Sequence, residues 1–245
     1  MRKTAYLLMV VFLIGCVVFT MTGCGKKKPT PTADPPADPE PYTWSQNFDG
    51  VAAGTSLAGL GFDLPDDDKC KAEVTDAKFV SQPHAAYFED NSTSKAAYAR
   101  MELPAELTDK LTENNKGTVK FSIWVDPANG KSSYVTLYNG SYSSTDRFID
   151  VSFTKEGNVQ VREKGDKTNT SSYTIGQYTR GEWVDVEFTW DYATQKFSLK
   201  VGEVTYDDLD CVQRLIPDRL EIKVGDNSGV GNIAYVDNLY YEIYP

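Results

Sequence analysis

The chain has 245 residues, of which 40% are hydrophobic and 24% are charged, and its formal net charge at pH 7 is −10. That hydrophobic fraction is enough for a packed core and excludes a disordered or collagen-like chain. The acidic balance disfavours nucleic acid as a partner, because phosphate backbones attract basic surfaces. With one histidine and four cysteines, the chain also offers few ligands for a zinc site.

Residues 1–23 follow the order of an export signal. Arg2 and Lys3 precede an almost wholly apolar run over residues 4–20, which falls slightly short of the about 20 residues that span a membrane. The tetrapeptide Met-Thr-Gly-Cys that ends at Cys24 resembles the lipobox of bacterial lipoproteins, in which the cysteine is lipidated. We therefore expect a lipoprotein signal peptide over 1–23 and a lipid anchor on Cys24. The protein would then be extracytoplasmic, on the outer membrane or cell surface of a bacterium.

Two other interpretations of this segment stay open. Residues 13–16 also fit a lipobox, but cleavage at Cys16 would leave the apolar residues 17–21 exposed at the start of the mature chain. An uncleaved anchor helix is the other. Residues 24–41 follow, rich in Pro, Thr and Asp and without a large apolar side chain until Tyr42. Such a segment cannot bury enough surface to fold, and its prolines favour extended conformations, so we expect a tether to the membrane.

Residues 42–245 have the length of one large all-β domain. Seven segments alternate apolar and polar residues, which places one face of each strand on a core and the other toward water. These segments are 118–125, 134–138, 148–153, 158–162, 183–190, 196–201 and 219–224. Turn residues such as Asn139-Gly140 separate them, and a short helix is predicted over 104–113. The pattern predicts an antiparallel β-sandwich with at most one short helix.

Four segments resemble the concanavalin A-like lectin and glucanase superfamily, most closely its laminin G-like jelly-roll modules. They are "FSIWVDP" (121–127), "FIDVSFTKEGNVQVR" (148–162), "GEWVDVEFTWDYATQKFSLKVGE" (181–203) and "IAYVDNLYYEIY" (233–244). The resemblance implies that the first strand, at 44–50, lies beside the last. It also implies a structural Ca²⁺ at the corner where Asp49 and Asp237 would meet, with backbone carbonyls completing the six to eight oxygen ligands. The alternative is that Asp49 caps a turn and Asp237 ends a strand.

The catalytic patterns of that superfamily are not met. Its glucanases need three carboxylates on one face of a strand, but Glu182 is an odd number of residues from Asp185 and Glu187 and points to the opposite side. His84, the single histidine, lacks the companion residues of a polysaccharide lyase, and there is no Gly-x-Ser-x-Gly elbow. We therefore expect a non-catalytic protein. A lyase or glycoside hydrolase with an atypical site is the alternative.

Cys70 and Cys211 are the two cysteines of the domain. In an oxidising compartment an even pair predicts one disulfide between the early and late parts of the fold. Two free buried thiols are the alternative.

A carbohydrate ligand is the expected partner, because outward-facing aromatic side chains can stack on sugar rings and polar groups can hold hydroxyls. Strand parity turns Tyr134, Tyr138 and Trp124 away from their apolar neighbours, and Tyr142 and Arg147 follow in the next loop. We predict that these residues form a glycan-binding platform: Tyr134, Tyr138, Tyr142, Arg147, Trp124 and Arg162. Tyrosines that merely cover the sheet are one alternative, and a surface protein that binds protein partners is another.

Overall fold

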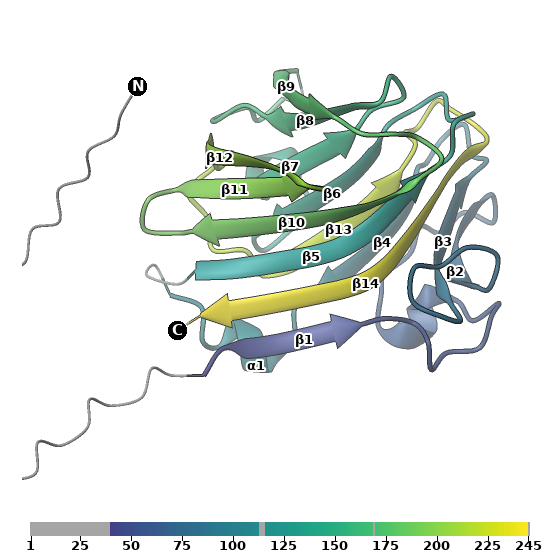
Figure 1. Ribbon diagram of the computed structural model, residues 1–245, viewed down its shortest axis with the longest axis horizontal. Coiled ribbons are helices and arrows are strands. Elements are labelled where there is room, and N and C mark those ends of the chain that lie inside the picture. The colour runs from purple at the N-terminus through teal and green to yellow at the C-terminus, as the bar shows by residue number, and fades with distance from the viewer. Residues whose placement is uncertain (1–39, 113–115, 169, 245) are drawn as a thin grey trace, which may run out of the picture. The chain divides into compact units, whose positions relative to one another are not determined.

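The computed structural model describes residues 40–112, 116–168 and 170–244, and these form two antiparallel sheets packed face to face (Figure 1). The predicted all-β sandwich is confirmed. The predicted signal peptide, Cys24 and the tether up to residue 39 lie outside the described residues. Within the described part of the chain, no helix is both long and apolar enough to cross a membrane.

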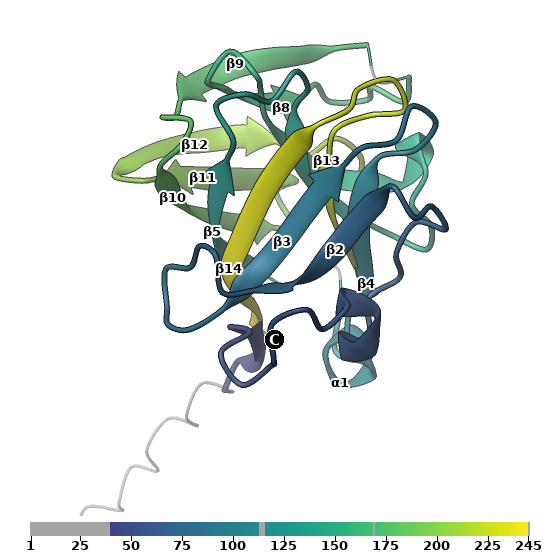
Figure 2. The ribbon, with the colours of Figure 1, turned by 90° about the vertical axis from the view of Figure 1, so that its right-hand side faces the viewer.

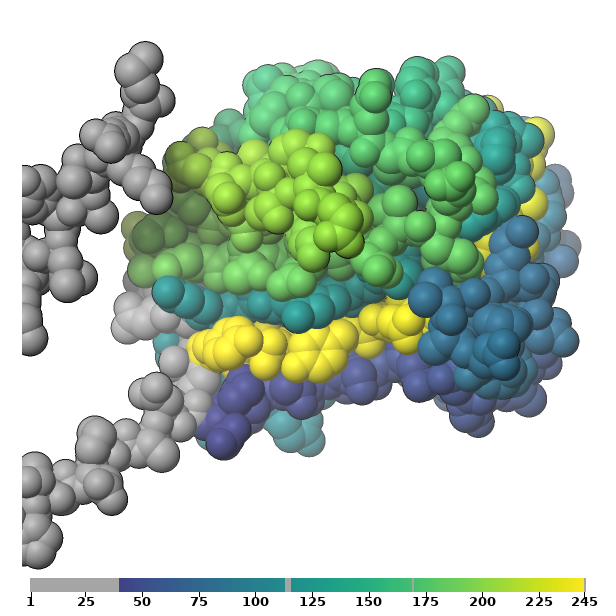
Figure 3. Space-filling view, viewed as in Figure 1, coloured from purple at the N-terminus to yellow at the C-terminus, as the bar shows by residue number. Residues whose placement is uncertain are grey.

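The larger sheet has eight strands in the order β12-β11-β10-β5-β14-β3-β2, with β1 paired to β14. Figure 3 shows its outer face, where β1, β14, β5 and the strands β10 to β12 lie side by side. Its strands are β1 (Tyr42–Gln46), β2 (Cys70–Thr75), β3 (Ala85–Asp90), β5 (Lys116–Val125), β10 (Trp183–Asp191), β11 (Lys196–Val201), β12 (Val204–Asp210) and β14 (Asn232–Tyr244).

The smaller sheet has six strands in the order β4-β13-β6-β7-β8-β9. Figure 2 shows the edge of the larger sheet that ends in β14, β3 and β2, with strand β4 of the smaller sheet beside β2. The strands of the smaller sheet are β4 (Ala97–Glu102), β6 (Ser133–Tyr138), β7 (Arg147–Phe153), β8 (Asn158–Arg162), β9 (Ser172–Gln177) and β13 (Arg219–Val224). The short helices are α1 (Ala105–Thr108) and the 3-10 turns η1 (Leu57–Leu60) and η2 (Ser144–Asp146).

All seven strands predicted from alternation form, as β5, β6, β7, β8, β10, β11 and β13. The strands that alternation did not reveal include the edge strands β9 and β12, whose side chains are mostly exposed on both faces and carry little pattern. The predicted helix over 104–113 is a single turn, Ala105–Thr108, with only Leu107 buried. One apolar contact does not give a stripe that could hold a longer helix.

Aromatic side chains join the two sheets in the core. Phe121 of the larger sheet packs edge-on against Phe153 of the smaller sheet, with ring centroids 6.5 Å apart. Trp190 pairs across β10 and β5 with Gly117, and its indole fills the space where a side chain at residue 117 would stand. A Cβ added to Gly117 would lie 2.1 Å from the Trp190 ring, so glycine is needed there for packing.

The first and last strands lie side by side, as the resemblance implied. β1 pairs antiparallel with β14, and Trp44 lies opposite Tyr241. The chain therefore enters the sandwich beside the strand on which it ends.

The predicted disulfide is absent, because Cys70 and Cys211 are both free thiols. Cys70 begins β2 at one edge of the larger sheet, whereas Cys211 directly follows β12 at the other edge. A disulfide requires Cα atoms about 4.4–6.8 Å apart, and the width of the sheet separates these two. Burial raises the pKa of the Cys70 thiol to about 11 and that of Cys211 to about 12, so both resist ionisation.

Candidate functional site

The outer face of the smaller sheet carries three rows of polar and aromatic side chains that run across its strands. Alternation puts the apolar residues of these strands, such as Val135, Leu137 and Ile222, into the core and turns their neighbours outward. The rows are Glu102–Arg219–Tyr138–Arg147, Arg100–Glu221–Thr136–Asp150 and Tyr98–Lys223–Tyr134–Ser152–Gln160–Thr174. Charged, polar and aromatic side chains are thus gathered on this face.

A hollow of about 130 Å³ lies at the middle of the face. Its lining comes from four neighbouring strands and consists of Tyr134, Thr136, Tyr138, Arg147, Asp150, Arg162 and Lys223. Tyr134 is half-buried, and the Lys223 ammonium stands 4.4 Å from the centroid of its ring. This cation–π contact holds the lysine over the tyrosine at the rim of the hollow.

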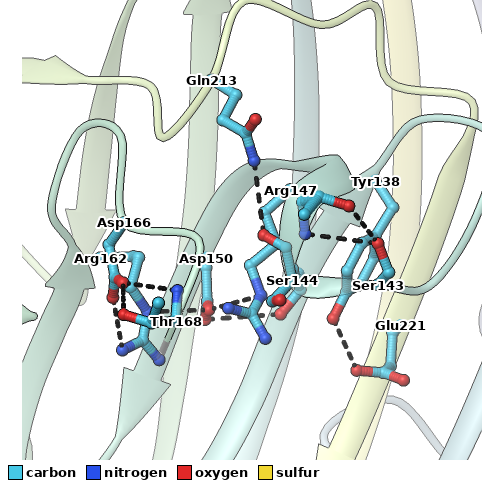
Figure 4. Close-up of polar contacts among 12 residues, drawn as sticks. Tyr138, Ser143, Ser144, Arg147, Asp150, Arg162, Asp166, Thr168, Gln213 and Glu221 are labelled. Atoms are coloured by element: carbon cyan, nitrogen blue, oxygen red, sulfur yellow. Dashed lines mark hydrogen bonds and ion pairs between the residues drawn. The ribbon is translucent and has the colours of Figure 1, made fainter. Parts of the chain in front are cut away.

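One wall of the hollow is a chain of buried ion pairs (Figure 4). Asp150 forms ion pairs with two arginines: its Oδ2 atom lies 3.1 Å from Nε of Arg147 and 3.2 Å from Nε of Arg162. Arg162 also reaches Asp166, at 3.4 Å. The side chains of Arg147, Asp150 and Arg162 are 8%, 4% and 11% exposed, so the network is shielded from water. Arg162 donates hydrogen bonds to both Asp150 and Asp166, and Arg147 is paired in charge with Asp150.

Asp166 is held by backbone as well as by arginine. The N–H groups of Ser171 and Thr168 donate to its carboxylate, and together with Arg162 they hold the pKa of Asp166 well below its usual range. The loop between β8 and β9 is thereby tied to the end of Arg162. The carboxylate stays ionised and keeps this arginine in place.

Glu221 lies beside the hollow and holds Tyr138, which lines it. The Glu221 carboxylate accepts hydrogen bonds from Nε of Arg100, at 2.6 Å, and from the hydroxyl of Tyr138, at 3.1 Å. The Tyr138 ring packs against Tyr142, with centroids 5.5 Å apart, and Arg100 lies 4.7 Å above the Tyr142 ring. These contacts form a preorganised polar surface whose side chains support one another.

The tyrosines of this face favour the protonated form. Burial, and then the nearby Glu221 carboxylate, raise the pKa of Tyr138. Burial likewise raises the pKa of Tyr134, and it raises the pKa of Tyr142 to about 12. All three hydroxyls are therefore hydrogen-bonding groups at neutral pH and not phenolate bases.

The structure brings together five of the six residues predicted for the platform: Tyr134, Tyr138, Tyr142, Arg147 and Arg162. Tyr138 is only 3% exposed, however, because Tyr142 covers its ring and Glu221 holds its hydroxyl. It shapes the hollow and cannot offer a ring face to a sugar, contrary to the prediction. Arg147 is also buried, at 7% exposure.

The prediction for Trp124 is wrong in its location. Trp124 does point away from the core, but it lies on β5 in the larger sheet and faces the opposite side of the sandwich. It belongs to a cross-strand row with Tyr87, Tyr235 and Trp183. The indole is 8% exposed, because it packs against Tyr235 and the Lys78 ammonium lies 4.4 Å from its ring. Strand parity gives the side of a sheet but not which sheet.

Sequence reasoning missed several charged residues of the face, among them Arg100, Asp150, Glu221 and Lys223. A signal was present in "RLEIKV" (219–224), where alternation places Glu221 and Lys223 on the polar side of a strand. That signal gave no neighbours, because β13 lies between β4 and β6 only in the folded sheet.

A larger hollow, of about 390 Å³, lies on the outer face of the larger sheet. Asp185 and Glu187 both line it, so the prediction that they share a face is confirmed. Its charged groups are exposed: the Lys120–Glu187 pair spans 3.7 Å, with 48% and 37% of the side chains exposed. We favour the smaller hollow as the functional site, because its Arg147, Asp150 and Arg162 side chains are buried and paired with one another.

Asp49 and Asp237 meet at the corner predicted for a cation, on either side of Ser81. The Ser81 hydroxyl lies 3.4 Å from Oδ1 of Asp49, 3.3 Å from Oδ1 of Asp237 and 3.0 Å from Oδ1 of Asn238. The backbone N–H groups of Val80 and Ser81 already donate to Asp237. No group of three or more His, Cys, Asp or Glu side chains that could hold a metal occurs in the described ranges. Any cation here would need amide, hydroxyl and backbone oxygens as well.

No known protein family matches the chain, and no curated protein matches it. Solved structures share its fold at low identity. A sialidase matches with a TM-score of 0.62 and 9% identity, over 81% of this chain but only 18% of that one. The carbohydrate esterase of the Shiga toxin-encoding bacteriophage phi24B matches with a TM-score of 0.56 and 13% identity, over 82% and 97% of the two chains. The endo-β-1,4-glucuronan lyase of Trichoderma reesei matches at 0.50 and 8%, over 76% and 92%. The chain thus has a β-sandwich fold that also occurs in carbohydrate-active proteins.

Proposed function

We propose that the sandwich binds a carbohydrate in the hollow of the smaller sheet and does not cleave it. The observation that carries the proposal is the hollow itself, where the partly exposed Tyr134 stands beside arginines paired with buried carboxylates. An apolar surface with a few fixed polar groups is what a sugar ring needs, since it offers C–H faces and hydroxyls. The carbohydrate-related names of the proteins that share this fold support the choice of ligand. The finer assignment to a concanavalin A-like module is part of this proposal.

Binding without cleavage is supported by the state of the side chains. Removal of a proton by tyrosine requires the phenolate, which burial disfavours at Tyr134 and Tyr138. Asp150 and Glu221 are both committed to arginine partners. His84 contacts the Asp49 carbonyl, at 3.4 Å, and does not line the hollow.

The test of binding is a glycan array followed by calorimetric titration of the best ligand. Tyr134→Ala should weaken binding about tenfold, since losing one stacked ring costs on the order of 1–2 kcal/mol. Tyr240→Ala is the matched control, because Tyr240 lines the hollow on the other sheet. It should leave the affinity unchanged. Loss of binding in the control, with none in Tyr134→Ala, would move the site to the larger sheet.

An enzyme of the same fold is the second candidate, favoured by the lyase and sialidase among the structures of similar fold. It is tested by incubating the protein with polysaccharides and following reducing ends and the absorbance of unsaturated uronates. We expect no product. Product formation would overturn the non-catalytic part of the proposal.

We also propose that the protein is held at a bacterial membrane by a lipid on Cys24, which lies outside the described residues. Gly25 rather than Asp follows this cysteine, and by analogy this favours the outer membrane. Labelled palmitate should be incorporated, and Cys24→Ala should abolish the label while Cys16→Ala should not. Labelling that survives Cys24→Ala would contradict the assignment.

A structural Ca²⁺ at the Asp49–Asp237 corner is a further part of the proposal. The converging donors are oxygens, which a hard cation prefers. Adding Ca²⁺ to chelator-treated protein should raise its melting temperature, and Asp49→Asn should reduce that rise. An unchanged melting temperature would exclude a structural role for the ion.

A further inference from the structure

The hollow of the smaller sheet has a positive charge imbalance in an otherwise acidic chain. Its lining contains three cations, Arg147, Arg162 and Lys223, and one carboxylate, Asp150. Counting Asp166, which also contacts Arg162, still leaves the cations in excess. The whole chain has a net charge of −10, so this local excess runs against the average. A hollow lined mainly by positive charges raises the local concentration of anions.

Lys223 carries the excess charge. The arginines of the face each lie within 4 Å of a carboxylate: Arg100 by Glu221, Arg147 and Arg162 by Asp150, and Arg219 by Glu102. Among the residues that the structure describes, no carboxylate lies within 4.0 Å of the Lys223 ammonium, whose close neighbour is the Tyr134 ring. A half-buried lysine whose close neighbour is an aromatic ring still has hydrogen-bond donors to offer a ligand.

The dimensions favour one anionic substituent in this hollow. Its volume of about 130 Å³ is less than the roughly 300–1,000 Å³ of pockets that enclose a drug-sized ligand. A second hollow of about 250 Å³ adjoins it, and Tyr134 lines both. There the cations are already paired, Lys131 with Asp226 at 2.9 Å and Lys155 with Glu156 at 3.8 Å. The second hollow is therefore balanced in charge and suits a neutral part of the ligand.

We propose that the face selects acidic glycans. A carboxylate or sulfate group of the glycan binds Lys223 in the hollow of about 130 Å³, and the neighbouring sugar residue lies beyond Tyr134 in the second hollow. This inference rests on the proposed function and narrows its ligand class. Recognition depends on the ammonium of Lys223, with the guanidinium groups of Arg147 and Arg162 providing the positive wall. Neutral oligosaccharides occupy the second hollow alone and bind more weakly than acidic ones.

The experiment titrates the full-length protein with four probes at low and high ionic strength. A hyaluronan octasaccharide supplies carboxylates alone, a carrageenan hexasaccharide supplies sulfates alone, a chondroitin sulfate octasaccharide supplies both, and cellohexaose is neutral. The oligosaccharide whose anionic group binds Lys223 should bind at least about tenfold more tightly than cellohexaose, and added salt should reduce this difference in affinity. The two single-anion probes distinguish carboxylate from sulfate.

Lys223→Gln should remove the advantage of the acidic probe, a loss of about tenfold, while Lys223→Arg should retain it. Lys200→Gln makes the same charge change in the hollow of the other sheet and should have no effect. Melting curves show whether each variant is folded. If cellohexaose binds as tightly as every acidic probe and Tyr134→Ala still weakens it, acidic selectivity is refuted while carbohydrate binding stands. If no oligosaccharide binds, both proposals fail.

Discussion

Replacing Asp150 with asparagine removes the negative charge that two buried arginines share. Arg147 then loses the carboxylate 3.1 Å from its Nε, and Arg162 keeps only its contact with Asp166 at 3.4 Å. Breaking a buried ion pair by removing one partner costs about 3–5 kcal/mol, because the remaining charge is left without compensation. Asp166 still compensates Arg162, so we expect the lower end of that range, about 3 kcal/mol of the free energy of unfolding.

Asp210→Asn is the matched control. Asp210 is also contacted by two cations, Lys164 at 3.3 Å and Lys196 at 3.2 Å, but its side chain is 40% exposed. Exposed pairs contribute about 0–1 kcal/mol, and salt screens them. The two variants therefore make the same chemical change to carboxylates with the same number of cationic partners and differ in burial.

The assay is equilibrium unfolding in urea, with thermal melting as a second measurement. For a domain of this size, about 3 kcal/mol corresponds to a melting temperature lower by roughly 6–12 °C. The deficit of Asp150→Asn should persist in high salt, and that of Asp210→Asn should shrink. If Asp150→Asn costs no more than its control, the network does not act as a buried one, and the arginines of the hollow are not paired as described.

Three other outcomes are expected. Gly117→Ala should destabilise the fold by about 1–3 kcal/mol or more in urea unfolding, because its methyl group meets the Trp190 ring; no change would mean that the indole can move aside. Burial raises the pKa of Asp90 from 3.8 to about 6, so the folded state binds the proton more tightly than the unfolded state. The free energy of unfolding of the wild type, relative to that of Asp90→Asn, should therefore decrease as the pH rises from about 4 to about 6. A flat difference over that range would contradict it. A reducing agent should leave the melting temperature unchanged, because Cys70 and Cys211 are free thiols; a lower value would reveal a disulfide.

The tether, the lipid anchor on Cys24 and the site on the membrane stay predictions from the sequence, since they concern residues outside the described ranges. For the sandwich, local pattern was sufficient in several places. Alternation in "YVTLY" (134–138) correctly turned Tyr134 and Tyr138 away from Val135 and Leu137, because the direction of a side chain depends only on its own strand.

What a side chain meets after it leaves its strand was decided by tertiary structure. Trp124 and Tyr134 both point outward, but the sheet order puts them on opposite sides of the sandwich. Tyr138 is outward yet buried, since Tyr142 folds over it from the following loop. The hollow needs Lys223 from β13 beside Tyr134 from β6, 89 residues earlier in the chain, and only the pairing of those strands brings them together. Parity is local information, whereas sheet order depends on which strands exchange backbone hydrogen bonds over long separations, and no short stretch of sequence carries it.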